Sequence, residues 1–209
     1  MKKIYFVRHG ESEGNAARVH QSKDTPLSEI GMSQAKMVAL RFKNIQVERI
    51  IASPYTRARQ TAQAIADYNN LKIEDNSLFQ ERRGLSELIG LSQLSEQSKQ
   101  IRANLHQHLL EDGGSWRYSD EESAVEFAAR SKQALEFLQK RSENNLVVVS
   151  HALNIRMLLA NVLNQTGELK HLYEIYSNFD LNNTSLSVIA YDGDKARWQV
   201  ICINDHSHL

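Results

Sequence analysis

The apolar residues of this chain follow two patterns that alternate along it. Short apolar runs are typical of strands buried on both faces of a parallel sheet, and longer amphipathic stretches have the period of α-helices. The runs lie at Ile4–Val7, Arg49–Ala52, Leu71–Ile73 and Leu146–Val149. The helical stretches lie at about 28–43, 55–68, 95–110, 121–141 and 152–163. This alternation predicts an α/β fold with a parallel sheet.

The C-terminal part of the chain departs from this alternation. The runs Ser185–Tyr191 and Trp198–Ile203 are joined across Asp192-Gly193-Asp194, which is typical of a hairpin that closes the sheet. The segment between about 91 and 143 is polar, lacks strand patterns and is interrupted at Gly113-Gly114. We interpret it as a helical insertion that covers one end of the sheet, within a single domain of residues 1–209.

Charge and cysteine content limit the classes of function. Lys and Arg together number 25, as do Asp and Glu, so the chain has no net field to attract nucleic acid or an anionic membrane. The single cysteine, Cys202, fits a reducing compartment. The first apolar run, four residues long, is too short for a signal peptide or membrane span. We therefore expect a cytoplasmic protein.

Polar groups follow the predicted strands at matching positions. His9 ends the first run, Arg57 opens the helix after the second, Glu81 follows the third, and His151 ends the fourth. In parallel sheets these positions meet at one edge, where ligands bind. The gathered groups, with Arg8 beside His9, would suit phosphoryl transfer without a metal, because arginine matches phosphate oxygens and histidine can accept the transferred group.

The charge of a phosphate would then be met by the protein alone. We expect Arg8, Arg57, a protonated His151 and the helix N-terminus near Ser53 to contact its non-bridging oxygens. The other ring nitrogen of His9 needs an acceptor that fixes its tautomer, which we expect to be a backbone carbonyl.

Several motifs resemble the histidine phosphatase superfamily, also called phosphoglycerate mutase-like. They occur in the family's order along essentially the whole chain. The motifs are Arg8-His9-Gly10-Glu11-Ser12 with Asn15, Leu27-Ser28-Glu29-x-Gly31-x-x-Gln34-Ala35, Ser53-Pro54-x-x-Arg57-Ala58-x-Gln60-Thr61-Ala62, Glu122-Ser123-x-x-Glu126-Phe127-x-x-Arg130, Val149-Ser150-His151 and Asn204-Asp205-x-x-His208-Leu209.

This resemblance implies a mainly parallel sheet between two layers of helices. It also implies that His9 is the phosphorylated nucleophile and Glu81 the proton donor, with no cofactor. Arg8, Arg57 and His151 would complete the phosphate pocket, and Asn15 would contact phosphate or substrate.

Two departures from the family pattern concern the pocket wall. Ala152 stands where glycine often follows the second histidine, a small change. After Glu81 the chain reads Gly84-Leu85-Ser86-Glu87-Leu88 in place of the frequent Gly-x-Trp-Glu-Gly. Glu11 and Glu87 therefore remain alternatives to Glu81 as the proton donor.

We interpret the chain as a metal-independent phosphatase of a small phosphorylated metabolite. A phosphoglycerate mutase is the nearest alternative, but the residues from Arg18 to Asp24 lack the Asn-Arg-Phe-Thr-Gly-Trp type of stretch that such mutases carry. A regulator that binds phosphate or a phosphoprotein without turnover would not need His9. The substrate, the pathway and the oligomeric state have no readable code in the sequence.

Three further expectations concern individual segments. Arg82-Arg83 is expected on a solvated face, with contact to a second anionic group of the substrate as the alternative. Substrate specificity is expected from residues 91–119 and 21–25. Gly31 lowers helix stability near the start of its helix, and such a position calls for close packing.

Overall fold

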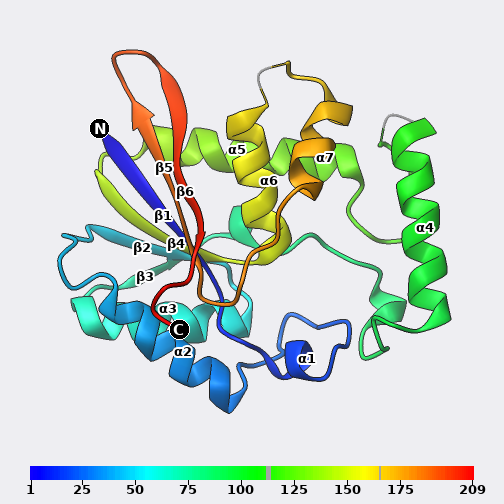
Figure 1. Ribbon diagram of the computed structural model, residues 1–209, viewed down its shortest axis with the longest axis horizontal. Coiled ribbons are helices and arrows are strands. Elements are labelled where there is room, and N and C mark those ends of the chain that lie inside the picture. Colours follow the sequence, from blue (N-terminus) through cyan, green and yellow to red (C-terminus); the bar gives the residue numbers. More distant parts are fainter. Residues whose placement is uncertain (112–113, 165) are drawn as a thin grey trace.

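Six strands form one mixed sheet, shown in Figure 1, in the order β3-β2-β4-β1-β5-β6. The computed structural model describes residues 1–111, 114–164 and 166–209. The strands β1, β2, β3 and β4 are parallel, whereas β5 is antiparallel to both β1 and β6. Their bounds are β1 (Lys2–Arg8), β2 (Arg49–Ala52), β3 (Ile73–Asp75), β4 (Asn145–Ser150), β5 (Leu186–Asp192) and β6 (Arg197–Asp205).

Helices cover both faces of the sheet and confirm the predicted fold class (Figure 1). The α-helices are α1 (Glu13–Ala16), α2 (Glu29–Leu40), α3 (Thr56–Asn69), α4 (Glu96–Glu111), α5 (Ala124–Lys140), α6 (Ala152–Leu163) and α7 (Leu169–Ser177). Two short 3₁₀ helices, η1 (Ser77–Phe79) and η2 (Ser86–Leu88), lie between β3 and α4. The helices α2 and α3 pack on one face, and α5 and α6 on the other.

The central strand β1 contributes to both cores because successive side chains point to opposite faces. Tyr5 and Val7 pack with the buried residues of α2 and α3, and Ile4 and Phe6 pack with those of α5 and α6. All four are at most 9% exposed. The apolar run before Arg8 is therefore packed on both faces, and this packing fixes the position of the residues that follow it.

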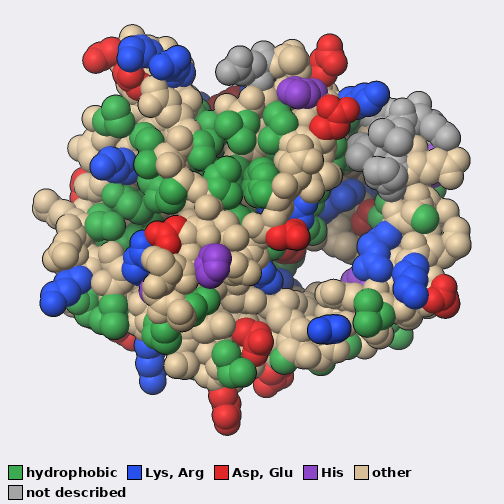
Figure 2. All heavy atoms as spheres, viewed as in Figure 1, with side chains coloured by type: hydrophobic (Ala, Val, Ile, Leu, Met, Phe, Trp, Pro, Cys, Tyr) green, Lys and Arg blue, Asp and Glu red, His purple; other side chains and the backbone are tan. Residues whose placement is uncertain are grey.

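The segment predicted as an insertion has two helices with different positions. Helix α5 packs on the sheet through Ala134, Leu135 and Leu138. Helix α4 lies apart from the sheet, on the right of Figure 1, and Ile101 packs with residues of the η2 region. Figure 2 shows this face of the molecule hollowed between the side that carries α4 and the rest. Gly113, of the predicted break, lies outside the described residues.

Two elements differ from the sequence-based expectation. The third strand was expected at Leu71–Ile73 but pairs with β2 through Ile73–Asp75. Leu71 belongs instead to the end of α3: it follows the left-handed cap residue Asn70 (φ 51°), and its backbone N–H donates to the Ala66 carbonyl. Helix α7 was not expected. Across the residues that the structure describes, no helix is long and apolar enough to cross a membrane.

Candidate active site

The ends of β1 and β4 place the two histidines side by side. These neighbouring parallel strands pair in register up to Arg8 and Ser150, so the residues that follow, His9 and His151, emerge together. Their ring centroids are 5.1 Å apart, and both residues are buried. The structure therefore brings these two predicted site residues together at the sheet edge.

Two hydrogen bonds define the tautomer of His9. Its Nδ1 lies 2.6 Å from the carbonyl oxygen of Gly10, so Nδ1 carries the proton and donates it. Arg57 Nε donates to His9 Nε2 over 3.3 Å, which requires a lone pair on Nε2. Burial, with Arg57 and Arg8 nearby, holds the pKa of His9 well below its usual range. The ring is therefore neutral at pH 7, with Nε2 as the nucleophilic atom.

The two arginines are fixed by backbone carbonyls. Arg57, near the start of α3, donates through Nη1 to the Ser22 carbonyl over 2.9 Å, and its guanidinium lies over the Tyr55 ring. Arg8 Nη1 donates to the Leu181 carbonyl. The Nε of Arg8 is buried and has no hydrogen-bond partner among the residues described here. Such a donor can bind an anionic oxygen in the pocket.

His151 is held by a hydroxyl that the sequence analysis did not assign to it. Its Nε2 lies 2.7 Å from Ser53 Oγ, and its Nδ1 is buried without a partner in the described part of the chain. Burial, with His9 and the arginines nearby, keeps the pKa of His151 well below its usual range. Among these protein groups the ring is therefore neutral at pH 7, and the protonated His151 expected beside a bound phosphate stays a prediction. A phosphate dianion beside the ring would raise that pKa again.

Glu81 reaches the pocket from the loop after η1. Its carboxylate accepts the backbone N–H groups of Leu153 over 3.3 Å and Asn154 over 3.1 Å, at the N-terminus of α6. His151, which precedes α6, does not cap the helix with its side chain. Glu81, from a different segment of the chain, caps it instead. Burial raises the pKa of Glu81, although backbone N–H donors and Arg57 oppose the shift.

The alternative carboxylates are placed differently. Glu11 Oε1 accepts a hydrogen bond from Ser28 Oγ over 2.7 Å, at the N-terminus of α2. Glu87 lies on η2 and is exposed. Of the three candidate donors, Glu81 is the carboxyl whose charge acts on both Arg8 and Arg57.

Asn15 takes part in the local structure that follows the nucleophile. Its Oδ1 accepts a hydrogen bond from the backbone N–H of Ser12, and its own backbone N–H donates to Ser12 Oγ, which together form a capping box for α1. The Nδ2 of Asn183 also donates to that Oδ1 over 3.4 Å and to the His9 carbonyl over 2.9 Å. These bonds use the oxygen of Asn15, and its Nδ2 group is the donor that could reach a ligand.

Two residues before β5 were missed by the sequence reasoning. Asn183 binds the His9 carbonyl, and the backbone N–H of Thr184 donates to the Arg8 carbonyl over 3.0 Å. Thr184 is buried with φ 54°, a conformation that few non-glycine residues adopt. The local sequence Asn182-Asn183-Thr184 is typical of a turn, and it gives no sign of a partner near residue 9.

The loop after α1 connects the site to the α4 side. His20 donates its backbone N–H to the Leu91 carbonyl and accepts one from Gly90, both over 2.9 Å. The His20 ring also contacts Ser98 Oγ of α4 over 2.9 Å. Because the Ser22 carbonyl of the same loop accepts a hydrogen bond from Arg57, this loop contacts both α4 and Arg57.

The arginines after Glu81 contact the protein itself. Arg82 is half-buried and donates from Nε and Nη2 to the Glu122 carbonyl. Arg83 is exposed and donates to the Asp120 carbonyl over 2.8 Å. The expected solvated face therefore describes Arg83, whereas Arg82 packs against the segment before α5.

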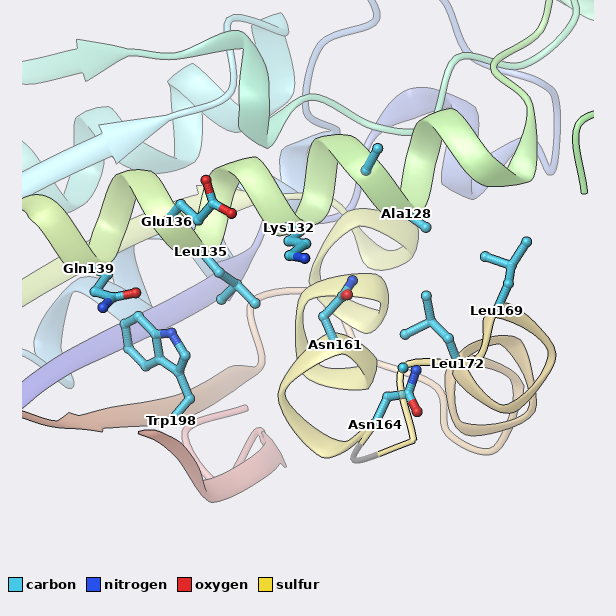
Figure 3. Close-up of a pocket in the computed structure, with 12 residues that line it drawn as sticks. Ala128, Lys132, Leu135, Glu136, Gln139, Asn161, Asn164, Leu169, Leu172 and Trp198 are labelled. Carbon is cyan, nitrogen blue, oxygen red and sulfur yellow. The ribbon is translucent and has the colours of Figure 1, made fainter. Parts of the chain in front are cut away.

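A separate groove lies away from these residues. Figure 3 shows it between α5, α6 and α7, with Trp198 of β6 at one end. Its volume is about 520 Å³, and none of the predicted site residues lines it. Within residues 1–111, 114–164 and 166–209, no cluster of three or more His, Cys, Asp or Glu side chains is placed to hold a metal ion.

Comparison with known proteins identifies the family of this chain. The histidine phosphatase superfamily (branch 1) matches residues 4–206, and the chain belongs to this superfamily. A probable phosphoglycerate mutase, GpmB, from Yersinia pestis is 30% identical over 215 residues, which cover 100% of this chain and 95% of that protein. Membership and relatives support a phosphoryl-transfer enzyme.

Solved structures share the fold. YhfR of Bacillus stearothermophilus superposes with a TM-score of 0.82 at 22% identity, over 100% of this chain and 99% of the other. Phosphoserine phosphatase from Entamoeba histolytica, in complex with 3-phosphoglyceric acid, gives a TM-score of 0.77 at 25% identity over 100% of both chains.

Proposed function

We propose that this chain is a phosphomonoester phosphatase that works through a phosphohistidine at His9. The observation that carries the proposal is the hydrogen bonding of the His9 ring. Gly10 holds the Nδ1 proton, so that Nε2 keeps its lone pair beside Arg57. A nucleophilic histidine requires an unprotonated nitrogen aimed at the ligand position, and this arrangement provides one at Nε2.

In the first half-reaction, the lone pair of His9 Nε2 forms a bond to phosphorus as the bond to the leaving oxygen breaks. Glu81 gives its proton to that oxygen, which departs as an alcohol. Its raised pKa favours the protonated form that this step needs. Positive charge that develops on the imidazole is stabilised by the Gly10 carbonyl, while Arg8 and Arg57 stabilise the phosphoryl oxygens.

In the second half-reaction, water attacks the phosphorus and the N–P bond breaks. Glu81, now a carboxylate, accepts a proton from the water, and inorganic phosphate leaves. The same side chain therefore serves as acid and then as base. No metal is assigned a role, because arginines and a neutral nucleophile provide the groups that the chemistry requires.

We expect the substrate to be a small phosphorylated metabolite. Its phosphate would lie among Arg8, Arg57 and His151, and its remaining part would extend toward α4 and the loop around His20. The structural relatives include a phosphatase of phosphoserine and one of glucosyl-3-phosphoglycerate, both small phosphomonoesters.

A phosphoglycerate mutase is the second candidate, and the name of the Yersinia relative favours it. The difference lies in the fate of the phosphohistidine, which a mutase returns to an isomeric substrate. The stretch from Arg18 to Asp24, which lacks the mutase-type sequence, favours hydrolysis.

A direct comparison of the two activities tests the proposal. The protein would be given a panel of phosphomonoesters, with phosphate release measured, and 3-phosphoglycerate, with isomerisation measured with and without bisphosphoglycerate. We expect phosphate release to be faster than isomerisation and independent of bisphosphoglycerate. Isomerisation with negligible phosphate release would favour the mutase. Phosphate binding without either reaction would favour a regulator.

A further inference from the structure

The segment from Glu122 to Arg130 contains a capping box and an ion pair that have no role in the reaction described above. Ser123 and Glu126 form a capping box that starts α5. Glu122, just before α5, and Arg130, within α5, form an ion pair in which their side chains are 10% and 13% exposed. The desolvation cost of two charges buried to this degree offsets much of their attraction, so the pair by itself contributes little net stability.

Arg130 uses its whole guanidinium. It holds Glu122 with two hydrogen bonds, Nε to Oε1 over 2.7 Å and Nη2 to Oε2 over 2.8 Å. Its Nη1 donates to the carbonyls of Leu78 and Gln80, both over 2.9 Å, and Nη2 reaches the Glu81 carbonyl over 3.4 Å. The backbone that leads into Glu81 is therefore bound by one planar side chain.

Glu122 binds the residues that follow Glu81. Its backbone N–H donates to the Arg83 carbonyl over 2.9 Å, and its Oε2 accepts the Arg83 backbone N–H over 3.3 Å. Arg82 donates to the Glu122 carbonyl and lies over the ring of Phe127. The Glu122–Arg130 pair therefore binds the backbone on both sides of Glu81.

The opposite side of this segment is fixed by β4 and α6. Ser150 Oγ donates to the Phe79 carbonyl over 2.6 Å, and Asn154 Nδ2 donates to the Leu78 carbonyl over 3.3 Å. The Glu81 carboxylate then meets the backbone N–H groups at the start of α6. The position of that carboxylate depends on a segment held between α5 and α6.

We propose that Arg130 is the positioning residue for the Glu81 carboxyl, with Glu122 orienting its guanidinium. This inference rests on the proposed function of Glu81 as proton donor. Lysine cannot replace Arg130, because a single ammonium cannot bind a carboxylate with two parallel bonds and three carbonyls at once. Loss of Arg130 would let Glu81 move relative to the leaving oxygen, and small displacements of a catalytic group reduce its contribution strongly.

The test compares leaving groups in single-turnover phosphorylation. An alkyl phosphate needs a proton on its departing oxygen, whereas p-nitrophenyl phosphate leaves with little help. We expect Arg130→Lys to slow phosphorylation by the alkyl phosphate about 10- to 100-fold, and to slow that by p-nitrophenyl phosphate much less. In a Glu81→Gln background, Arg130→Lys should add little further loss with the alkyl phosphate, because both changes remove one function.

Arg141→Lys is the matched control. Like Arg130, Arg141 forms ion pairs and lies over a phenylalanine ring: it pairs with the carboxylates of Glu74 and Glu143 and lies over Phe137. It follows α5 near the opposite end of the sheet, so its substitution should leave both rates unchanged. Thermal unfolding of each variant shows whether the fold is retained, and Glu122→Gln, which keeps the shape of the pair, provides a milder second variant.

The outcomes separate the two claims. If Glu81→Gln discriminates between the leaving groups but Arg130→Lys and Glu122→Gln slow both substrates equally, the positioning role is wrong and the proton donor stands. If Glu81→Gln itself slows both equally, Glu81 is not the donor and the inference falls with it. The inference is supported if Glu81→Gln and Arg130→Lys each slow the alkyl phosphate more than p-nitrophenyl phosphate, and if their effects on the alkyl phosphate are not additive in the double variant.

Discussion

Gly31 and Glu11 are in contact through their backbones where α2 begins. A β-carbon on Gly31 would lie 1.8 Å from the carbonyl oxygen of Glu11, and one on Gly10 would lie 2.5 Å from the carbonyl oxygen of Gly31. The first turn of α2 therefore packs directly on the turn that follows His9. This explains why a residue that lowers helix propensity stands near the start of a helix, as the sequence led us to expect.

We predict that Gly31→Ala destabilises the protein by about 1–3 kcal/mol, the usual cost of overpacking. The added methyl group meets backbone atoms, which cannot move aside without shifting the turn after His9. Urea unfolding measures the change. Gly84→Ala is the control, because a β-carbon at Gly84 meets no atom within 4 Å. A Gly31→Ala protein as stable as the parent would contradict the close packing.

The buried histidines predict how stability depends on pH. The pKa values of His9 and His151 are held well below 6.5 in the folded state, while the unfolded chain titrates near that value. Below pH 6.5 the unfolded chain therefore binds protons that the folded chain does not, and the free energy of unfolding falls. Each histidine contributes up to about 1.4 kcal/mol per pH unit. Glu81, with its raised pKa, acts in the opposite direction as the pH approaches 4.5.

His151→Gln tests this account, because glutamine keeps a polar contact for Ser53 but does not titrate. Urea unfolding between about pH 7 and about pH 5.5 should show a smaller loss of stability in the variant than in the parent. Equal losses in the two proteins would mean that His151 takes up its proton without unfolding.

Treatment with a chelator tests whether arginines or a metal ion supply the positive charge that stabilises the phosphoryl group. Arg8 and Arg57 face the proposed phosphate position, so phosphatase activity should survive prolonged treatment with a chelator. Orthovanadate should inhibit, because it adopts the five-coordinate geometry of the transition state. If chelation abolished activity and a divalent cation restored it, the charge would be supplied by a metal rather than by the arginines.

Much of the fold follows from local patterns. Buried runs such as Ile4–Val7 define the central strands because both faces of the sheet are covered. The short edge strand β3 was misplaced because its polar Glu74 and Asp75 have no strand pattern. Helix α7 does carry a signal, since Leu169, Leu172, Tyr173 and Tyr176 have helical spacing, and that signal was overlooked.

The site could be predicted where it depends on strand ends and not where it depends on distant contacts. His9 and His151 follow neighbouring parallel strands, so their proximity is a consequence of topology. The bond from Asn183 to the His9 carbonyl joins residues 174 positions apart, and nothing in the local sequence indicates it. The neutral state of His151 likewise depends on burial, which becomes visible when the chain is folded.

The central claim is that His9 Nε2 carries the phosphoryl group, and acid–base lability of the labelled protein tests it most directly. The protein would be mixed briefly with a ³²P-labelled phosphomonoester that the panel identifies as a good substrate, denatured in base, and divided between acid and base incubations. We predict label that is lost in acid, is stable in base and maps to His9, and no label in a folded His9→Ala variant. Label of the same stability in His9→Ala would contradict the account.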